Sequence, residues 1–332
     1  MKPRLHNFVG KTLLLFLICF SLLFKSYSQA FIFGNEKIKF EAGLSFGPSF
    51  FLGDLGGNRG KGTHFLKDWN YETLTLSKGA FFTMYPVNWA GFRLQVNHMM
   101  LKGDDALVNT MGINELWRKQ RNLDFKTSVF EAGVIIELYP TMMFGVDREN
   151  EPRLRPYLAG GAGIFKFNPQ GSLKDVNGNR TWYYLHSLRT EGQGMPEYPN
   201  SQPYQLTQLN IPLGGGLKYF VSDRVNVSME FLYRKTFTDY IDDVSQKYID
   251  PKDYAKYLSA QDASLAYKLS DKTTGIIYPG MTRFPAGTQR GDLKDKDTYF
   301  TVVAKVGFRL GAIYESSFAR RAARQTRCPS VY

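Results

Sequence analysis

The chain has 332 residues, with 42 Lys and Arg against 30 Asp and Glu, a formal net charge of +12 and only two cysteines. So few cysteines exclude a small disulfide-stapled protein. An aromatic share of 15% argues against long disordered segments, which contain few aromatic residues.

The first 28 residues have the layout of a secretory signal peptide. Lys2, Arg4 and Lys11 precede an apolar run over 12–24, and the small residue Ser28 follows shortly after it. The alternative is a transmembrane anchor, but the run is shorter than the roughly 20 residues that a spanning helix needs. We therefore expect cleavage after Ser28 and export of the chain. No later apolar run is long enough for a spanning helix.

Residues with period-two alternation predict β-strands in the exported part. Near the C-terminal end, for example, Phe300, Val302 and Ala304 alternate with Thr301 and Val303. The predicted strands are 37–47, 74–85, 89–101, 130–139, 155–167, 209–220, 224–234 and 300–310.

The links between these eight strands alternate in length. The link between strands two and three, and the link between strands six and seven, contain only a few residues each. The first, third, fifth and seventh links run from about twenty to nearly sixty, and the fourth is about a dozen. A soluble sandwich has no reason to sort its links by parity. The pattern predicts an all-β protein: an eight-stranded antiparallel up-and-down transmembrane β-barrel, with short periplasmic turns and long extracellular loops. The expected organisation is a signal peptide over 1–28, a barrel over 29–312 and a basic periplasmic tail over 313–332.

If the apolar stripes face lipid, the opposite stripes place charged side chains in the lumen. An eight-stranded barrel is just wide enough for side chains to fill, so we expect these charges to pair across strands instead of lining a pore. Glu230 is expected to pair with Lys305 or Arg309, and Glu41 with Arg309. A proton or substrate path is the functional alternative. The predicted lumen network comprises Glu41, Arg93, Glu131, Glu137, Lys218, Glu230, Arg234, Lys305 and Arg309.

Aromatic residues cluster near the predicted short turns, where an interfacial girdle belongs. The alternative is the general preference of strands for aromatic residues. The residues are Tyr85, Trp89, Tyr139, Tyr157, Tyr219 and Phe220.

The sequence contains no motif for catalysis, cofactor binding or a metal site. The histidines are isolated, and neither His-Glu-x-x-His nor Gly-x-Ser-x-Gly occurs. We therefore expect no enzymatic activity, no cofactor and no nucleic-acid partner. An acidic stretch with Asp239, Asp242, Asp243 and Asp250 indicates either calcium binding or, as we favour, solvated loop carboxylates.

The C-terminal tail is basic and carries a single cysteine. A basic segment in the periplasm can lie against anionic head groups or dock on an acidic partner, and otherwise it is a frayed end. One unpaired cysteine in an oxidising compartment indicates an intermolecular disulfide or a free thiol. The predicted partner-binding residues are Arg320, Arg321, Arg324, Arg327 and Cys328.

Several segments together resemble the PorG-like outer-membrane barrels of the type IX secretion and gliding machinery. They are FLGDLGG (51–57), RNLDFKTSVFEAGV (121–134), TFTDYIDDVSQKYID (236–250), RGDLKDKDTYF (290–300) and RCP (327–329). The resemblance implies a non-enzymatic barrel in the bacterial outer membrane that ties a periplasmic ring, formed by a lipoprotein and its partner protein, to that membrane. The alternative is a ligand-binding or weakly conducting barrel that acts through its extracellular loops.

Overall fold

A computed structural model describes residues 32–33, 36–56, 73–108, 112–143, 151–293 and 295–310. The chain divides into two units, Met1–Ile38 and Lys39–Tyr332. In the first unit, β1 (Ile32–Phe33) pairs antiparallel with β2 (Glu36–Lys37). The other elements belong to the second unit. No helix in the described ranges is long and apolar enough to cross a membrane.

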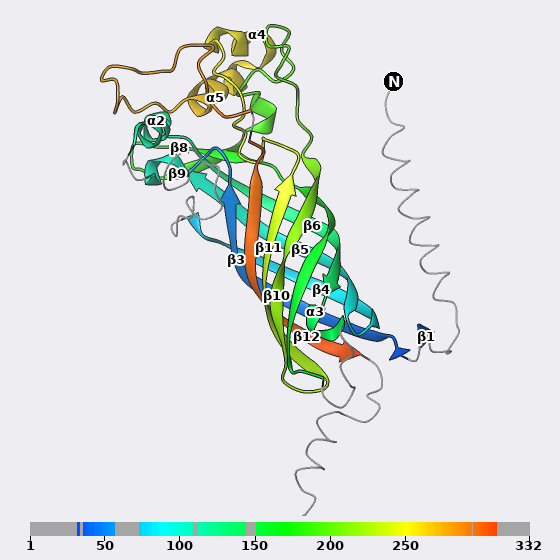
Figure 1. The fold of residues 1–332 in the computed structure, drawn as a ribbon. Coiled ribbons are helices and arrows are strands. Elements are labelled where there is room, and N and C mark those ends of the chain that lie inside the picture. The colour runs from blue at the N-terminus through cyan, green and yellow to red at the C-terminus, as the bar shows by residue number, and fades with distance from the viewer. Residues whose placement is uncertain are drawn as a thin grey trace, which may run out of the picture. The chain divides into compact units, whose positions relative to one another are not determined.

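The second unit contains a closed antiparallel β-barrel (Figure 1). Its eight strands are β3 (Lys39–Leu52), β4 (Thr75–Val87), β5 (Ala90–Asp104), β6 (Asp124–Leu138), β7 (Leu154–Lys166), β10 (Thr207–Phe220), β11 (Val225–Thr236) and β12 (Thr298–Leu310). Each strand pairs with its neighbour in the chain, β12 pairs with β3, and β5 with β6, so no barrel strand has a free edge. The predicted eight-stranded up-and-down barrel is confirmed.

The barrel is apolar outside and charged inside. Along each strand, alternate side chains are buried in the lumen and exposed on the outer face. Leu44 and Met229, on the outer face, are 68% and 63% exposed, whereas Glu41 and Arg93, in the lumen, are fully buried. Because such an outer surface suits hydrocarbon and not water, the fold is that of a transmembrane β-barrel. We call the apolar outer surface the apolar belt.

Links of two kinds meet at opposite ends of the barrel. Between β4 and β5, β6 and β7, and β10 and β11 the links are the shorter ones, and α3 (Pro140–Met143) lies in the second of them. We call this the turn end. The long links between β3 and β4, β5 and β6, β7 and β10, and β11 and β12 meet at the loop end.

The strands extend further at the loop end than the alternation predicts. β6 begins at Asp124 and not at residue 130, and Asp124 pairs with Asp104 of β5. The segment before Phe130 keeps its alternation, with Val129 inward and Lys126 outward. Its outward residues are polar because they lie beyond the apolar belt, so the apolar signal fades before the strand ends.

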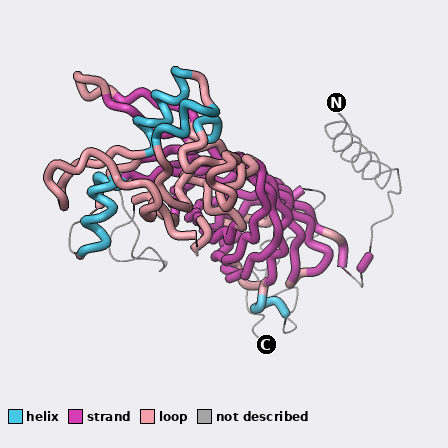
Figure 2. Tube along the Cα trace, turned by 90° about the horizontal axis from the view of Figure 1, so that it is seen from above, coloured by secondary structure: helices cyan, strands magenta, loops and turns pink. Residues whose placement is uncertain are grey.

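The long links form an ordered layer, the loop cap, which comprises the described residues of 53–56, 105–123, 167–206 and 237–297. Figure 2 shows its helices and loops gathered over one end of the strands. Its elements are η2 (Asp105–Leu107), α2 (Ile113–Arg121), β8 (Gln170–Lys174), β9 (Arg180–Tyr184), η4 (His186–Leu188), η5 (Pro251–Asp253), α4 (Tyr254–Tyr257) and α5 (Ala260–Ser270). β8 and β9 form a hairpin that joins the barrel sheet where Gln170 pairs with Lys126.

Two apolar clusters hold the loop cap together. One contains Leu55 and Ile241 of the cap packed with Leu101, Phe125 and Phe165 of the barrel, so it closes the lumen at the loop end. The other lies within the cap, where η4, α4 and α5 contribute apolar residues. The cap is therefore joined to the barrel through a buried core.

Candidate functional site

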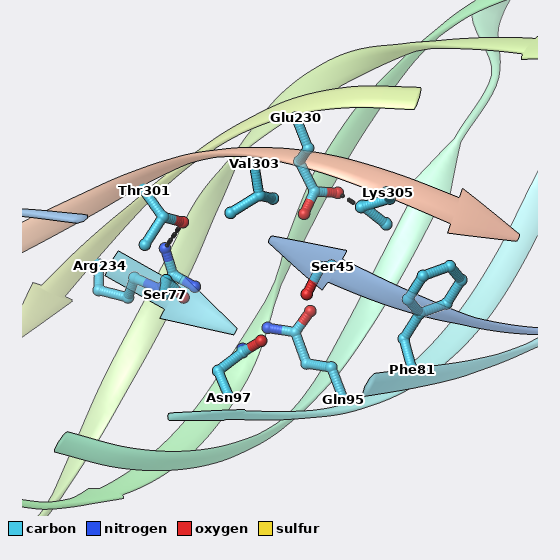
Figure 3. Close-up of a pocket in the computed structure, with 10 residues that line it drawn as sticks. All are labelled: Ser45, Ser77, Phe81, Gln95, Asn97, Glu230, Arg234, Thr301, Val303 and Lys305. Atoms are coloured by element: carbon cyan, nitrogen blue, oxygen red, sulfur yellow. Dashed lines mark hydrogen bonds and ion pairs between the residues drawn. The ribbon is translucent and has the colours of Figure 1, made fainter. Parts of the chain in front are cut away.

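The middle of the lumen is filled by a network of paired charges contributed by facing strands. Arg93 of β5 donates from Nη1 to Glu137 Oε1 and to Glu230 Oε2, both at 2.6 Å. Lys305 of β12 lies 3.2 Å from Glu230 and 3.6 Å from Glu137. Figure 3 shows Glu230 and Lys305 meeting inside the barrel. One arginine and one lysine thus hold two carboxylates from β6 and β11.

Towards the turn end, Lys218 of β10 extends the network. Its Nζ lies 3.1 Å from Glu41 and 3.6 Å from Glu137 and donates to the Tyr85 hydroxyl at 2.5 Å. The hydroxyl of Tyr139 also donates to Glu137, at 2.5 Å.

Towards the loop end, Glu131 of β6 forms a second centre. Arg234 Nε donates to it at 3.1 Å, and the Tyr299 hydroxyl at 2.8 Å. Amide groups of Asn97 and Asn210 each add a bond at 2.9 Å. The carboxylate therefore has both a counter-charge and neutral donors, as a buried charge requires.

All nine predicted lumen residues have inward strand positions, and the expected pair of Glu230 with Lys305 is present. The expected pair of Glu41 with Arg309 is not. These residues are opposite each other in the register, but Glu41 bonds to Lys218 and to the Asn226 amide. The Arg309 guanidinium instead stacks over the Phe220 ring at 4.1 Å. Glu230 likewise bonds to Arg93 and Lys305 and makes no described ion pair with Arg309.

The cavities described in the lumen are small. A polar cavity bordered by Ser45, Gln95, Asn97 and Thr301 measures about 10 Å³ (Figure 3). A second cavity, towards the turn end and bordered by Tyr85, Tyr139 and Arg309, has the same volume. Each of these volumes holds about one water molecule. The network therefore fills the lumen and does not line an open channel along the barrel.

Most of the predicted aromatic girdle lies inside the barrel. Tyr139 and Tyr157 are 2% and 3% exposed, and the Tyr157 hydroxyl donates to Glu230 at 2.8 Å. Tyr85 points into the lumen too, and Phe220 is buried; Trp89 and Tyr219 remain exposed. The girdle prediction was wrong for four of six residues. Strand parity could have corrected it, because Tyr157 shares its phase with the inward Arg155.

Two arginines bind the segments of the loop cap to one another. Arg290 bonds to Glu191 at 2.8 Å and to the carbonyl of Asp243 at 2.6 Å. Arg121 bonds to Asp105 at 2.7 Å and to the carbonyl of Arg290 at 2.6 Å. Both guanidinium groups are buried, so these bonds fix the relative position of three segments of the loop cap, 105–123, 167–206 and 237–297.

Three of the four acids in the acidic stretch, Asp239, Asp242 and Asp243, are buried and not solvated, so that prediction is wrong for them; Asp250 is partly exposed. Asp242 accepts the backbone N–H groups of Leu55 and Val244, both at 3.0 Å, and Asp243 accepts the Tyr204 hydroxyl at 2.7 Å. Within the described ranges, no group of three His, Cys, Asp or Glu side chains is arranged to hold a metal ion.

Burial changes the protonation of these loop acids. Because burial disfavours the ionised form, it raises the pKa of Asp239 to about 7 and that of Asp54 to about 6. Burial likewise raises the pKa values of Asp242 and Asp297 well above the ordinary range.

The histidines in the described part of the chain do not form a catalytic arrangement. His98 is on the outer face and contacts Ser128, and His186 contacts the carbonyl of Tyr204. The signal segment 1–28 and the tail 313–332, with its predicted partner-binding residues, lie outside the described residues.

Fold and lumen together define a class: an eight-stranded transmembrane β-barrel with a filled lumen and an ordered loop cap. No protein-family model matches the chain, and no curated protein matches it in sequence. Its fold is similar to that of solved barrels. One is a major outer membrane protein from Thermus thermophilus, at 9% identity, covering 83% of this chain and 100% of that chain, with a TM-score of 0.36. Another is OprG from Pseudomonas aeruginosa, at 11% identity, covering 83% of this chain and 96% of that chain, with a TM-score of 0.31. A third is Ail of Yersinia pestis, at 8% identity, covering 82% of this chain and 97% of that chain, with a TM-score of 0.31. We draw no functional argument from similarities this distant.

Proposed function

We propose that the chain is a bacterial outer-membrane protein whose long loops face the outside and whose turns face the periplasm. The apolar belt and the closed antiparallel sheet support this location, since β-barrels of this kind belong to outer membranes. The signal segment over 1–28 would direct export.

Within that membrane, the chain serves as a non-enzymatic component of a type IX protein secretion system, including its gliding form. It anchors a periplasmic ring, built from a lipoprotein and its partner protein, to the outer membrane. The observation that carries this proposal is the charge network across the lumen, whose two described cavities each hold about one water molecule. A barrel filled in this way provides a fixed position in the membrane and not a passage. The segments that resemble PorG-like barrels supply the identity of the machinery.

The periplasmic contact is assigned to residues 313–332, with Cys328 and the four arginines before it. Outer membranes from the wild type and from Cys328→Ser are compared by non-reducing electrophoresis. We expect a reducible high-mass band in the wild type that contains a periplasmic lipoprotein by mass spectrometry and is absent from the variant.

Deletion of 313–332 should likewise release the lipoprotein from co-purification. Deletion of the exposed hairpin tip 175–179 is the matched control and should not. A monomeric protein that purifies alone in every case would overturn the anchoring role.

A second candidate function, ligand binding or weak conductance through the loops, is favoured by the order of the loop cap, which has its own apolar core. Planar-bilayer recordings test the conducting form of this candidate, because the anchor predicts no steady conductance.

Replacement of 250–286 by a short Gly-Ser linker tests the loops directly. The residues on either side of this segment are already held together by two backbone hydrogen bonds. The N–H group of Tyr248 donates to the carbonyl of Thr288 at 2.9 Å, and the N–H group of Gly287 donates to the carbonyl of Tyr248 at 2.7 Å. The replacement should leave co-purification with the lipoprotein unchanged if the barrel is an anchor, and should abolish a loop-based activity.

A further inference from the structure

Charged residues on the outer face of the barrel strands have a strong bias in sign and position. Two outward acids, Asp104 and Asp124, lie opposite each other in the register at the loop-end tips of β5 and β6. Every other charged side chain on the outer face of the eight strands is a lysine. All of them lie in the loop-end half of their strands. They are Lys78, Lys102, Lys126, Lys166 and Lys235.

Three of these lysines come from neighbouring strands and form one surface, the lysine patch. Lys102 of β5 is directly opposite Lys126 of β6. Lys166 of β7 is opposite Phe130, which lies four residues further along β6, or about 13 Å at roughly 3.3 Å per residue. Lys102 and Lys166 are exposed, and Lys126 is partly exposed. Like charges directly opposite each other in a sheet are destabilising, so this arrangement calls for a counter-charge.

The described protein does not supply that counter-charge. No described carboxylate lies within 4.0 Å of the three ammonium groups; the Lys126 ammonium is instead 4.3 Å from the centre of the Trp182 ring. Asp104 and Asp124, the nearest acids on the same face, are already paired. Arg180 contacts them at 3.0 and 3.5 Å, and Lys272 binds Asp124.

The lysine patch is continuous with the apolar belt. Along the outer face, the next outward residues towards the turn end include Met100 beside Lys102, Ile164 beside Lys166, and Phe130 beyond Lys126. A ligand that covers both surfaces must have an apolar body and an anionic head. A phosphorylated membrane lipid has this chemistry, and phosphate is the anion that lysine ammonium groups commonly bind.

We propose that Lys102, Lys126 and Lys166 bind the phosphate head group of a lipid in the leaflet at the loop end of the barrel. The acyl chains of that lipid lie against the belt residues below the patch. Naming that leaflet as the outer one rests on the orientation proposed above; the binding itself rests only on the barrel.

The test uses the full chain, purified in detergent, with diphosphoryl lipid A as the probe and native mass spectrometry to count bound lipid. The triple variant Lys102→Gln, Lys126→Gln, Lys166→Gln should weaken binding at least tenfold. A matched triple in the loop cap, Lys247→Gln, Lys252→Gln, Lys268→Gln, changes the net charge equally and should stay within twofold of the wild type. Lipid A without its phosphates should bind the wild type only weakly. Its affinity should be as low as that of diphosphoryl lipid A for the triple variant of the lysine patch.

Two further variants cover the case in which the first triple does not fold. Lys102→Arg, Lys126→Arg, Lys166→Arg keeps the charges and should retain binding, whereas Lys166→Gln alone, at the exposed end of β7, should reduce it severalfold. The proposal is overturned if the cap triple loses binding as the patch triple does, or if phosphate-free lipid A binds equally well. Because only barrel and lipid are present, either result is independent of the secretion role.

Discussion

Arg93 is the residue on which the lumen network depends most. Its Nη1 bonds to two carboxylates, Glu137 and Glu230, and all three side chains are almost fully buried. A buried ion pair contributes little net stability compared with a well-packed apolar core, but losing one partner leaves an uncompensated charge. The network therefore makes the lumen intolerant of single substitutions and favours one packing of the strands.

Replacing Arg93 by Met should thus lower the free energy of unfolding by about 3–5 kcal/mol. Urea unfolding in lipid vesicles, followed by tryptophan fluorescence, measures the change. Arg224→Met, at the exposed turn before β11, is the matched control and should stay within about 0.5 kcal/mol of the wild type. Equal losses in the two variants would contradict the role of the network.

Asp239 should make the stability of the loop cap depend on pH. Its pKa is raised from 3.8 to about 7, so the folded state holds the proton more tightly than the unfolded state does. The stabilising contribution is complete below about pH 4 and is lost as the pH rises through about 7. The melting temperature of the cap should fall across this window in the wild type and fall less in Asp239→Asn. Asp175→Asn, at the exposed hairpin tip, should retain the wild-type slope.

At the scale of elements, the sequence predicted the barrel strands, whose apolar residues have a period of two, and missed the elements of the loop cap, which have no such period. All eight barrel strands were predictable because lipid on one side and a filled lumen on the other impose strict alternation. The β8–β9 hairpin and the helices of the cap were missed, because they pack against one another over the barrel end, where no single solvent boundary sets a pattern. The lumen residues could be predicted from parity; their partners could not, since Lys218 and Glu41 are 177 positions apart in the chain.

Close approach of two strands accounts for one glycine of β7, Gly161, but not for its neighbour Gly160. A Cβ at Gly161 would lie 2.0 Å from the carbonyl oxygen of Val134 on β6, whereas at Gly160 it would meet only the Leu213 side chain at 3.3 Å. A backbone atom of a paired strand cannot move aside, whereas the end of a side chain can, so an added methyl group should disturb the barrel far more at Gly161 than at Gly160.

We therefore expect Gly161→Ala to slow or block barrel folding and Gly160→Ala to leave it near the wild-type rate. Refolding into lipid vesicles, measured by the shift of the folded band in unheated electrophoresis, gives both rates. Similar rates for the two variants would show that the strands can separate locally at Gly161.

At the scale of the whole molecule, the barrel and the loop cap are held by different interactions. Ladder hydrogen bonds and lumen ion pairs stabilise the barrel. The cap depends on a few buried side chains such as Arg290, which joins segments around Glu191, Asp243 and Ser270. The cap should therefore loosen while the barrel stays folded.

In Arg290→Met, limited proteolysis should cut within 237–297 many times faster than in the wild type, with the strands still protected. Mass spectrometry of the fragments locates the cuts. Arg283→Met, a more exposed arginine of the same link, should change the rate little. Cleavage within the strands of Arg290→Met would show that cap and barrel unfold together.

The inward position of Tyr85, Tyr139 and Tyr157 bears on how the protein adjusts to the thickness of its membrane. With these rings in the lumen, Trp89 and Tyr219 are the remaining predicted girdle residues on the outer surface near the turns. If lipid phosphates hold the lysine patch at the opposite end, the position of the barrel along the membrane normal is set mainly at the loop end. A thinner or thicker bilayer would then be accommodated mainly at the turns. The turn end, where the proposed function places the partner, would then move relative to the lipid surface without strain in the cap.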